Sequence, residues 1–252
     1  MTHTSKRSPK IICVSSGKGG VGKTSFSVNV AAALAQKGKK VLLIDGDLGL
    51  ANVDVLLGLN IRHTIREALE DARDPLSLLV EIIPGFHILP ASSGVPEMAN
   101  LTPEAQAFLT RALDGIVARF DFVLVDTAAG IGDSVLWFNH WAEENIVILS
   151  PDPTAMTDAY ALIKVLNTRH GKKHFSLIVN SVKSKKEADD VFLNMSNVLA
   201  RFLHLHPDHL GSIPQDSSVG KAIRQQKPFL LLGPEGKASR SVYLIADTII
   251  KM

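Results

Sequence analysis

The chain has 252 residues, of which 46% are hydrophobic and 21% charged, so global disorder is excluded and a sizeable apolar core is expected. Its 27 Lys and Arg residues against 25 Asp and Glu give a net charge of +2, which argues against a polybasic protein. The single cysteine, Cys13, excludes an intrachain disulfide. No apolar run approaches the roughly 18 residues that a membrane-spanning helix needs, and no signal-peptide pattern is found. We therefore expect a reducing, cytoplasmic setting.

Short, almost continuously apolar runs alternate along the chain with segments of helical periodicity. The runs predict strands at residues 10–16, 39–45, 85–91, 120–127, 144–151, 174–182 and 209–214. The segments between them predict helices at residues 22–36, 103–119, 132–142, 154–167, 185–203, 219–226 and 236–250. Continuous apolar runs suit strands that are buried on both faces. We therefore predict an α/β fold, a doubly wound and mostly parallel sheet with helices on both faces.

The domain organisation is predicted to be simple. Residues 1–9 precede the first strand and predict a flexible N-terminal tail. The remainder contains no internal repeat, low-complexity tract or long linker. Because a chain of this size can close one doubly wound core, residues 10–252 are predicted to form a single domain.

A glycine-rich loop joins the first predicted strand to the first predicted helix. The pattern G-x-x-x-x-G-K-[ST] is matched by Gly17, Lys18, Gly19, Gly20, Val21, Gly22, Lys23 and Thr24. The glycines allow backbone N–H groups to approach phosphate oxygens, and the helix N-terminus adds positive potential. We expect Lys23 to reach the β- and γ-phosphates, Thr24 to ligate Mg²⁺ and Ser25 to lie beside the nucleotide. The alternative, an ordinary glycine-rich turn, does not account for the strand and the helix on either side.

Three aspartates end predicted strands. Asp45 and Asp47 end the second, and Asp126 ends the fourth. In a doubly wound sheet ligands bind at the carboxyl ends of the strands, so these side chains are expected to converge near the loop. Carboxylates suit Mg²⁺, either directly or through water, and all three are candidate metal residues. Turn-capping roles are the alternatives, and the choice between water positioning and metal contact stays open for Asp45 and Asp47.

The loop and four further segments resemble the MinD/ParA branch of deviant Walker ATPases, and within it the flagellar-number regulators of the FlhG/FleN group. The matching segments are residues 15–59, 89–95, 124–135, 150–166 and 211–229. The K-G-G-x-G-K-T form of the loop is specific to the deviant Walker class. ParA-type partition proteins usually carry D-x-D-P-Q after the second strand, so Leu48 and Gly49 argue against that group.

The resemblance implies roles for matching positions. Lys18 corresponds to the signature lysine, which in this family crosses a dimer interface and contacts the partner's nucleotide. Asp47 corresponds to the aspartate that orients the attacking water, so the implied catalytic set is Lys18, Lys23 and Asp47. Positions at the switch region or the dimer interface correspond to Asn52, Asp152 and Asp158. Adenine-contacting positions correspond to Asn180, Pro214 and Asp216. An amide suits the adenine edge, but Asn180 as a simple turn residue remains an alternative.

The implied function is a Mg²⁺-dependent ATPase that acts as an ATP-switched homodimer and regulates flagellar number or placement. Its implied partner is a flagellar assembly protein or a transcriptional regulator. The alternatives are a ParA-like ATPase that positions cargo or DNA, and an ATP-gated binding module for a transcription factor or basal-body protein.

Departures from the family pattern and the distribution of charged residues bear on further partners. The DQAxxLR segment of many FlhG proteins is not found before the loop, which argues against activation of an FlhF-type GTPase. Nucleic acid is not expected, because the lysines on either side of the strand predicted at residues 174–182 suit a solvated surface; they are Lys172, Lys173, Lys183, Lys185 and Lys186. The last predicted helix carries few basic residues, so membrane contact is expected to be weak. A cytoplasmic location is implied, with polar or peripheral membrane association as the alternative.

Overall fold

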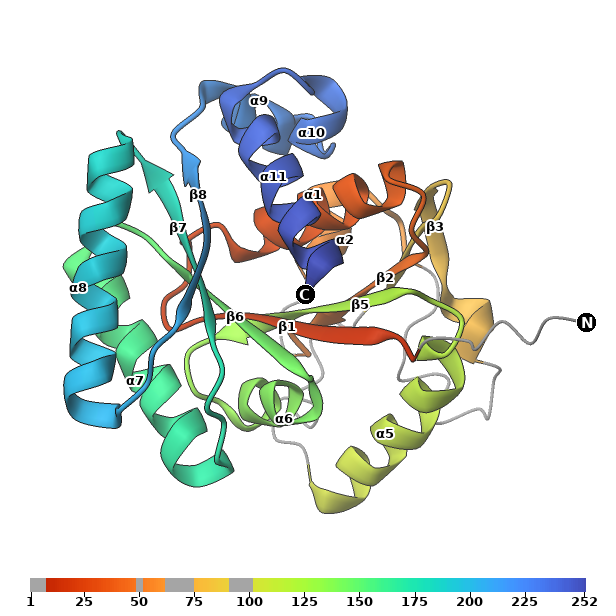
Figure 1. Ribbon diagram of the computed structural model, residues 1–252. Coiled ribbons are helices and arrows are strands. Elements are labelled where there is room, and N and C mark those ends of the chain that lie inside the picture. Colours follow the sequence, from red (N-terminus) through yellow and green to blue (C-terminus); the bar gives the residue numbers. More distant parts are fainter. Residues whose placement is uncertain (1–7, 49–51, 62–74, 91–101) are drawn as a thin grey trace, which may run out of the picture.

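The computed structural model describes residues 8–48, 52–61, 75–90 and 102–252, which build one sheet flanked by helices (Figure 1). The strands in sheet order are β3 (Val80–Ile83), β4 (Phe86–Leu89), β2 (Val41–Gly46), β5 (Phe122–Ala129), β1 (Lys10–Ser16), β6 (Glu144–Leu149), β7 (Ser176–Val182) and β8 (Asp208–Pro214). All neighbouring strands are parallel except β3 and β4, which run antiparallel. The predicted doubly wound, mostly parallel sheet is confirmed.

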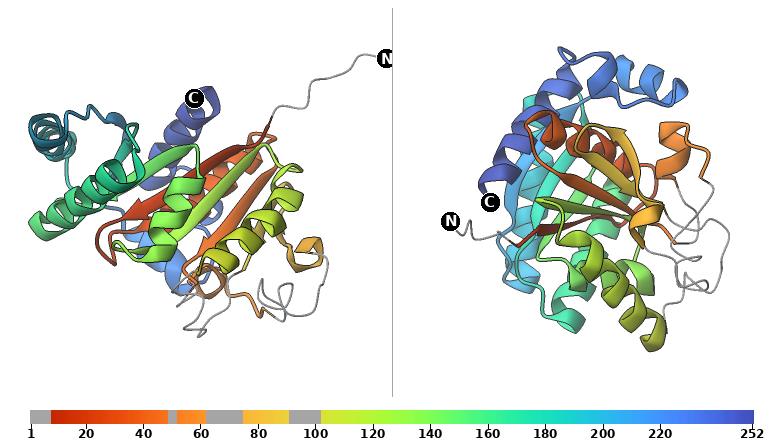
Figure 2. Two further views of the ribbon diagram at one scale, coloured as in Figure 1. Left: turned by 90° about the horizontal axis from the view of Figure 1, so that it is seen from below. Right: turned by 90° about the vertical axis from the view of Figure 1, so that its right-hand side faces the viewer.

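Helices cover both faces of this sheet (Figure 2). One face carries α1 (Lys23–Gln36), α10 (Phe229–Leu232) and α11 (Lys237–Lys251). The other carries α5 (Pro103–Val117), α6 (Asp133–Trp141), α7 (Pro153–His170) and α8 (Lys185–Leu203). Shorter elements are α2 (Val53–Leu57), the 3-10 helix η1 (Pro75–Leu78) and α9 (Ser217–Arg224). Within the described residues, we find no helix with the length and apolar character needed to cross a lipid bilayer.

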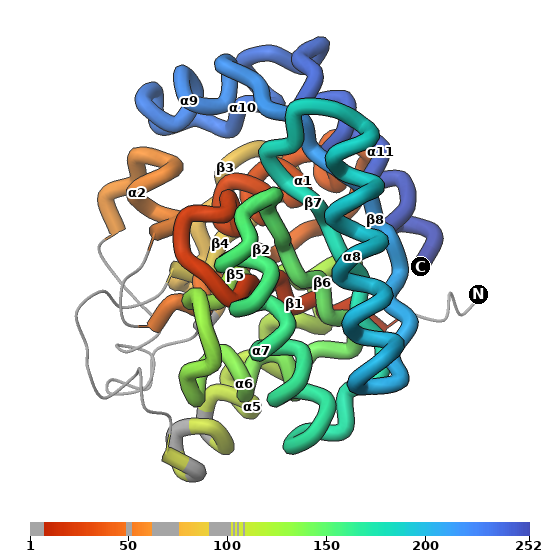
Figure 3. Tube along the Cα trace, turned by 90° about the vertical axis from the view of Figure 1, so that its left-hand side faces the viewer, coloured from red at the N-terminus to blue at the C-terminus, as the bar shows by residue number. Residues whose placement is uncertain are grey.

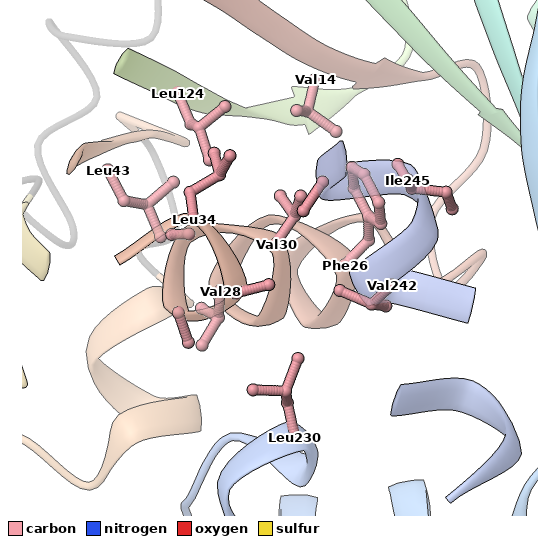
Figure 4. Close-up of a cluster of buried hydrophobic side chains, with 14 of the residues drawn as sticks. Val14, Phe26, Val28, Val30, Leu34, Leu43, Leu124, Leu230, Val242 and Ile245 are labelled. Atoms are coloured by element: carbon pink, nitrogen blue, oxygen red, sulfur yellow. The ribbon is translucent and has the colours of Figure 1, made fainter. Parts of the chain in front are cut away.

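The apolar strand runs are explained by burial on both sides. In β1, Ile12 and Val14 pack toward α1, whereas Cys13 between them packs toward α5 and α6. Helix α1 lies between the sheet and the C-terminal helices: Leu34 lies beside Leu124 of β5, whereas Leu230 of α10 lies on the opposite side of α1 (Figure 4). Burial of this kind contributes about 1.5–3 kcal/mol for each large apolar side chain. The glycine-rich loop thus leads into a helix that packs against several neighbouring elements.

The two edges of the sheet are irregular. β3 at one edge shows a register shift between Glu81 and Ile83. β8 at the other edge shows shifts in its pairing with β7 and ends at Pro214.

The structure also adds elements that the sequence did not predict. β3, α2, η1 and α10 have four or five residues each, too few for a clear periodicity. Several predicted bounds shift at their ends, so that the strand predicted at residues 85–91 is β4 and the helix predicted at 103–119 is α5. Residues 1–7 of the predicted tail lie outside the described residues, as do 49–51 and 91–95 of the resembling segments. Every described strand joins one sheet. The single domain over residues 10–252 stays a prediction.

Candidate nucleotide-binding site

The glycine-rich loop leaves β1 after Ser16 and enters α1 at Lys23. Gly22 caps the helix with a φ of 92°, a left-handed conformation that favours glycine. Gly17 lies against the backbone of α7: a Cβ built on it would stand 2.1 Å from the carbonyl carbon of Asp158 and 2.4 Å from the nitrogen of Ala159. Asp158, predicted at the dimer interface, thus meets the loop through its backbone. The loop therefore packs against α7 as well as leading into α1.

A buried ionic cluster lies below the loop. Asp126, at the carboxyl end of β5, is only 1% exposed and Lys23 only 9%. Lys23 Nζ lies 3.3 Å from Asp126 Oδ1, which also accepts a 2.8 Å hydrogen bond from the hydroxyl of Ser27. Thr24 donates its hydroxyl to Asp126 Oδ2 at 2.7 Å. The Asp126 carboxylate therefore orders the first turn of α1. This turn includes Thr24, which also borders the space where phosphates are expected.

Asp45 holds the segment that follows β2. Its Oδ1 accepts from the backbone N–H of Asp47 at 3.1 Å, and its Oδ2 accepts from those of Asn52 and Val53 at 3.1 and 3.2 Å. Asn52 in turn donates its side-chain amide to Asp47 Oδ2 at 3.3 Å. Asp47 and Asn52 face the cleft above the loop, whereas the Asp45 carboxylate is turned to the backbone. In this structure Asp45 positions the Asp47 segment, and its part in metal binding stays a prediction.

The environment of Asp45 predicts a pH-dependent stability. Burial and the neighbouring Asp126 raise the pKa of Asp45 to about 7. The folded chain therefore retains a proton that the unfolded chain loses near pH 4, and the unfolding free energy falls as pH rises from about 4 to about 7. Three pKa units correspond to about 4 kcal/mol as an upper limit. Asp45→Asn should flatten this fall in urea unfolding measured from pH 4 to 8. Parallel profiles for variant and wild type would contradict the assignment.

Lys18 is folded back onto its own subunit. Its Nζ lies 2.9 Å from Asp152 Oδ2 and also donates to the hydroxyl of Thr154. Asp152 is the N-cap of α7 and accepts the backbone N–H of Thr154 at 2.7 Å. Lys18 and this cap together hold the pKa of Asp152 well below its usual range. Both side chains are more than a third exposed, so the pair is solvated and easily exchanged.

Two clefts meet above the loop. A phosphate-side cleft of about 630 Å³ is lined by Lys23, Thr24, Asp47 and Asn52. A second cleft of about 700 Å³ is lined by Asn180, Pro214 and Asp216, the predicted adenine-contacting residues. Both clefts share a wall formed by Gly20, Gly22, Ser25 and Ile223. Their combined shape suits an elongated ligand with phosphates at one end and a base at the other.

The predicted base-contacting residues also have structural partners. Asn180 donates its amide to the backbone oxygen of Val21 at 2.7 Å and lies under Gly22, where a Cβ would stand 2.2 Å from its Nδ2. Asp216 caps α9 through the N–H of Ser218 and accepts the N–H of Ala238, so its carboxylate joins α9 to α11. Pro214 ends β8 at the cleft wall. Contact of these three residues with adenine stays a prediction.

The structure brings most predicted residues together and adds others. Lys23, Thr24, Asp47, Asn52 and Asp126 converge at the loop, while Lys18 and Asp152 form a separate pair beside it. Further residues that reach the site are Ser27, Ser181, Gln215, Ile223, Arg224 and Gln226. Ser27 could have been found from its position four residues after Lys23, which places both on one helix face. Ser181 lies in β7, Ile223 and Arg224 lie in α9, and Gln215 and Gln226 follow β8 and α9. None of these positions carries a sequence signal.

The residues present fit a magnesium nucleotide. The Thr24 hydroxyl and the Asp126 carboxylate are adjacent hard oxygen donors beside the loop. Among the residues that the structure describes, no group of three His, Cys, Asp or Glu side chains could hold a metal by itself. The Thr24 hydroxyl and the Asp126 carboxylate suit Mg²⁺, which keeps several waters and binds substrate phosphates. Sheet, loop and clefts together define a P-loop NTPase.

Comparisons with known proteins agree with this class. A ParA family model, described as NUBPL iron-transfer P-loop NTPase, matches residues 7–250. The antiactivator FleN of Pseudomonas aeruginosa is 42% identical over 95% of this chain and 86% of its own length. The flagellum site-determining protein YlxH of Helicobacter pylori is 36% identical over 97% and 83%. The structure of the septum site-determining protein MinD from Pyrococcus horikoshii, complexed with Mg-ADP, superposes with a TM-score of 0.78 at 25% identity over 96% of each chain. The chain belongs to the ParA/MinD family of P-loop ATPases.

Proposed function

We propose that this chain is a Mg²⁺-dependent ATPase that works as an ATP-switched homodimer and regulates flagellar number or placement. Lys18 carries the proposal. It is absent from the walls of both described clefts and is held instead by Asp152 and Thr154 at the subunit surface. A lysine of the glycine-rich loop whose ammonium is turned away from the phosphate site of its own subunit is available to a second subunit. The names of the FleN and YlxH relatives support the flagellar part.

The site residues suit hydrolysis across such a dimer. Lys23 would balance phosphate charge once the nucleotide competes with Asp126 for its ammonium, and Lys18 of the second subunit would add a cation at the γ-phosphate. Mg²⁺ bound beside Thr24 would neutralise further phosphate charge. Asp47, steadied by Asn52, would hold the attacking water in line. The partner regulator would dock on the ATP-bound dimer, whose lifetime the hydrolysis limits.

The test is ATPase activity per subunit measured against protein concentration with Mg²⁺. We expect wild-type activity to rise and saturate, because each site needs Lys18 of a second subunit. Lys18→Ala should stay at the low-concentration level, about 10²–10³-fold below the wild-type plateau. Asp152→Asn should reach half of its plateau at a lower concentration, because asparagine keeps the α7 cap but loosens Lys18.

Lys186→Ala, an exposed lysine at the start of α8, is the matched control and should follow the wild type. Activity that is flat with concentration and equal in wild type and Lys18→Ala would exclude the shared site. In cells that lack the chain, flagellum counts should be restored by wild type and not by Lys18→Ala. Normal counts without the chain would exclude the flagellar role.

A further inference from the structure

Gln226 adopts a backbone conformation that is unfavourable for its residue type. Its φ is 53°, in the left-handed region that glycine usually occupies. It follows α9, where Gln226 N–H donates to Ile223 O at 3.0 Å and Lys227 N–H donates to Ala222 O at 3.2 Å. This is the helix-ending motif in which glycine is the usual residue at the Gln226 position. A side chain has therefore been kept where glycine would remove the strain.

The Gln226 side chain contacts α2, the short helix that follows Asp47 and Asn52 in the chain. Gln226 Nε2 donates to the backbone oxygen of Val55 at 2.9 Å, in the last turn of α2. A Cβ built on Gly58, at the end of α2, would stand 3.1 Å from Gln226 Cβ. The two helix ends thus contact each other, and α2 lies beside α9 (Figure 3). Helix α2 begins just after Asn52, whose N–H is held by Asp45.

The helix that carries Gln226 also borders both clefts. Val219 and Gly220 in α9 line the cleft with Asn180, Ile223 lines both clefts, and Arg224 lines the phosphate-side cleft. We propose that Gln226 is a positioning residue that ties occupation of the Asn180 cleft by a purine base to the placement of α2 and Asp47. A base bound against α9 would restrict the motion of Gln226, and Gln226 would in turn restrict the motion of α2 and Asp47. The base would then affect the hydrolytic step as well as the binding step.

This inference rests on the proposed ATPase cycle, and its test separates substrate binding from catalysis. Gln226→Gly removes the side-chain contact and also the strain. We expect its melting temperature to equal or exceed that of the wild type, while kcat for ATP falls about three- to tenfold, the loss expected for one hydrogen bond. KM should change less than kcat. Gln226→Ala should show the same kinetic loss, and Gln225→Ala, its exposed neighbour, should behave as wild type.

A second readout needs no hydrolysis. Amides of residues 53–59 should gain protection from hydrogen exchange when Mg²⁺ and a non-hydrolysable ATP analogue bind to the wild type, and Gln226→Gly should lose that gain. The inference is overturned if Gln226→Gly keeps both wild-type kcat and wild-type protection. If the wild type shows no ATPase activity, the proposed function fails, and the exchange experiment alone decides the role of Gln226.

Discussion

Replacing Gly17 by alanine is expected to destabilise the fold by about 3 kcal/mol and to abolish nucleotide binding. The added Cβ would fall 2.1 Å from the carbonyl carbon of Asp158 and 2.2 Å from its oxygen. Both atoms belong to the backbone of α7, which has no rotamer with which to move aside. Relief would require α7 or the loop to shift, and either movement disturbs the loop geometry. Chemical unfolding and titration with a fluorescent nucleotide would measure the two effects.

Gly19→Ala is the matched control in the same loop. No atom lies within 4 Å of a Cβ at Gly19, and its φ is not in the left-handed range. Its unfolding free energy should stay within about 0.5 kcal/mol of wild type. Equal destabilisation by the two substitutions would show that the close approach of Gly17 to α7 does not limit stability.

Asp126→Ala is expected to cost about 3–5 kcal/mol, because it leaves Lys23 buried without its counter-charge. Lys23 is only 9% exposed, and its Nζ lies 3.3 Å from Asp126. The substitution also removes the acceptor for the hydroxyls of Thr24 and Ser27. ATP hydrolysis should fall by about 10²–10³-fold, because the phosphate-facing groups lose their anchor. Urea unfolding and steady-state ATPase assays measure the two losses.

The double variant Lys23→Met, Asp126→Ala separates charge from shape. Methionine fills most of the lysine volume without its charge, so the double variant should regain at least half of the stability lost by Asp126→Ala. It should remain as inactive as the single variant. Ser27→Ala, which loses one hydrogen bond to the same carboxylate, should cost only about 1 kcal/mol. A double variant no more stable than Asp126→Ala would show that the unpaired charge is not the cause.

Much of the fold could be predicted because its strands are buried on both faces. Continuous apolar runs such as that of β5 distinguish a parallel sheet from a one-sided sheet, and the helices between them have clear periodicity. The missed elements are short. Among the described strands β3 pairs only with β4 and lies at an edge, so its four residues need little apolar character. Helix α2 buries only Val53 and Leu57, and its bonds to Asp45 and Gln226 depend on distant parts of the chain.

The site was predictable where chemistry follows a local pattern. The loop from Gly17 to Thr24 has a fixed spacing, and Asp126 ends an obvious strand. The orientation of side chains was not predictable. Asp45 and Asp47 are two residues apart, yet one carboxylate faces backbone N–H groups and the other lines the cleft. Gln226 joined the site only because α9 folds back over α2, a long-range contact without a sequence signature.

The irregular strands at both ends of the sheet have a consequence for self-association. An edge strand with unpaired backbone N–H and C=O groups can pair with a strand of another chain, and repeated pairing produces fibres. β3 is short and has a register shift beside Glu81, and β8 ends at Pro214, which has no N–H to donate. Strand-to-strand growth is therefore disfavoured at either end. A protein whose proposed cycle brings identical subunits together at high local concentration can then form closed, reversible pairs without seeding aggregates.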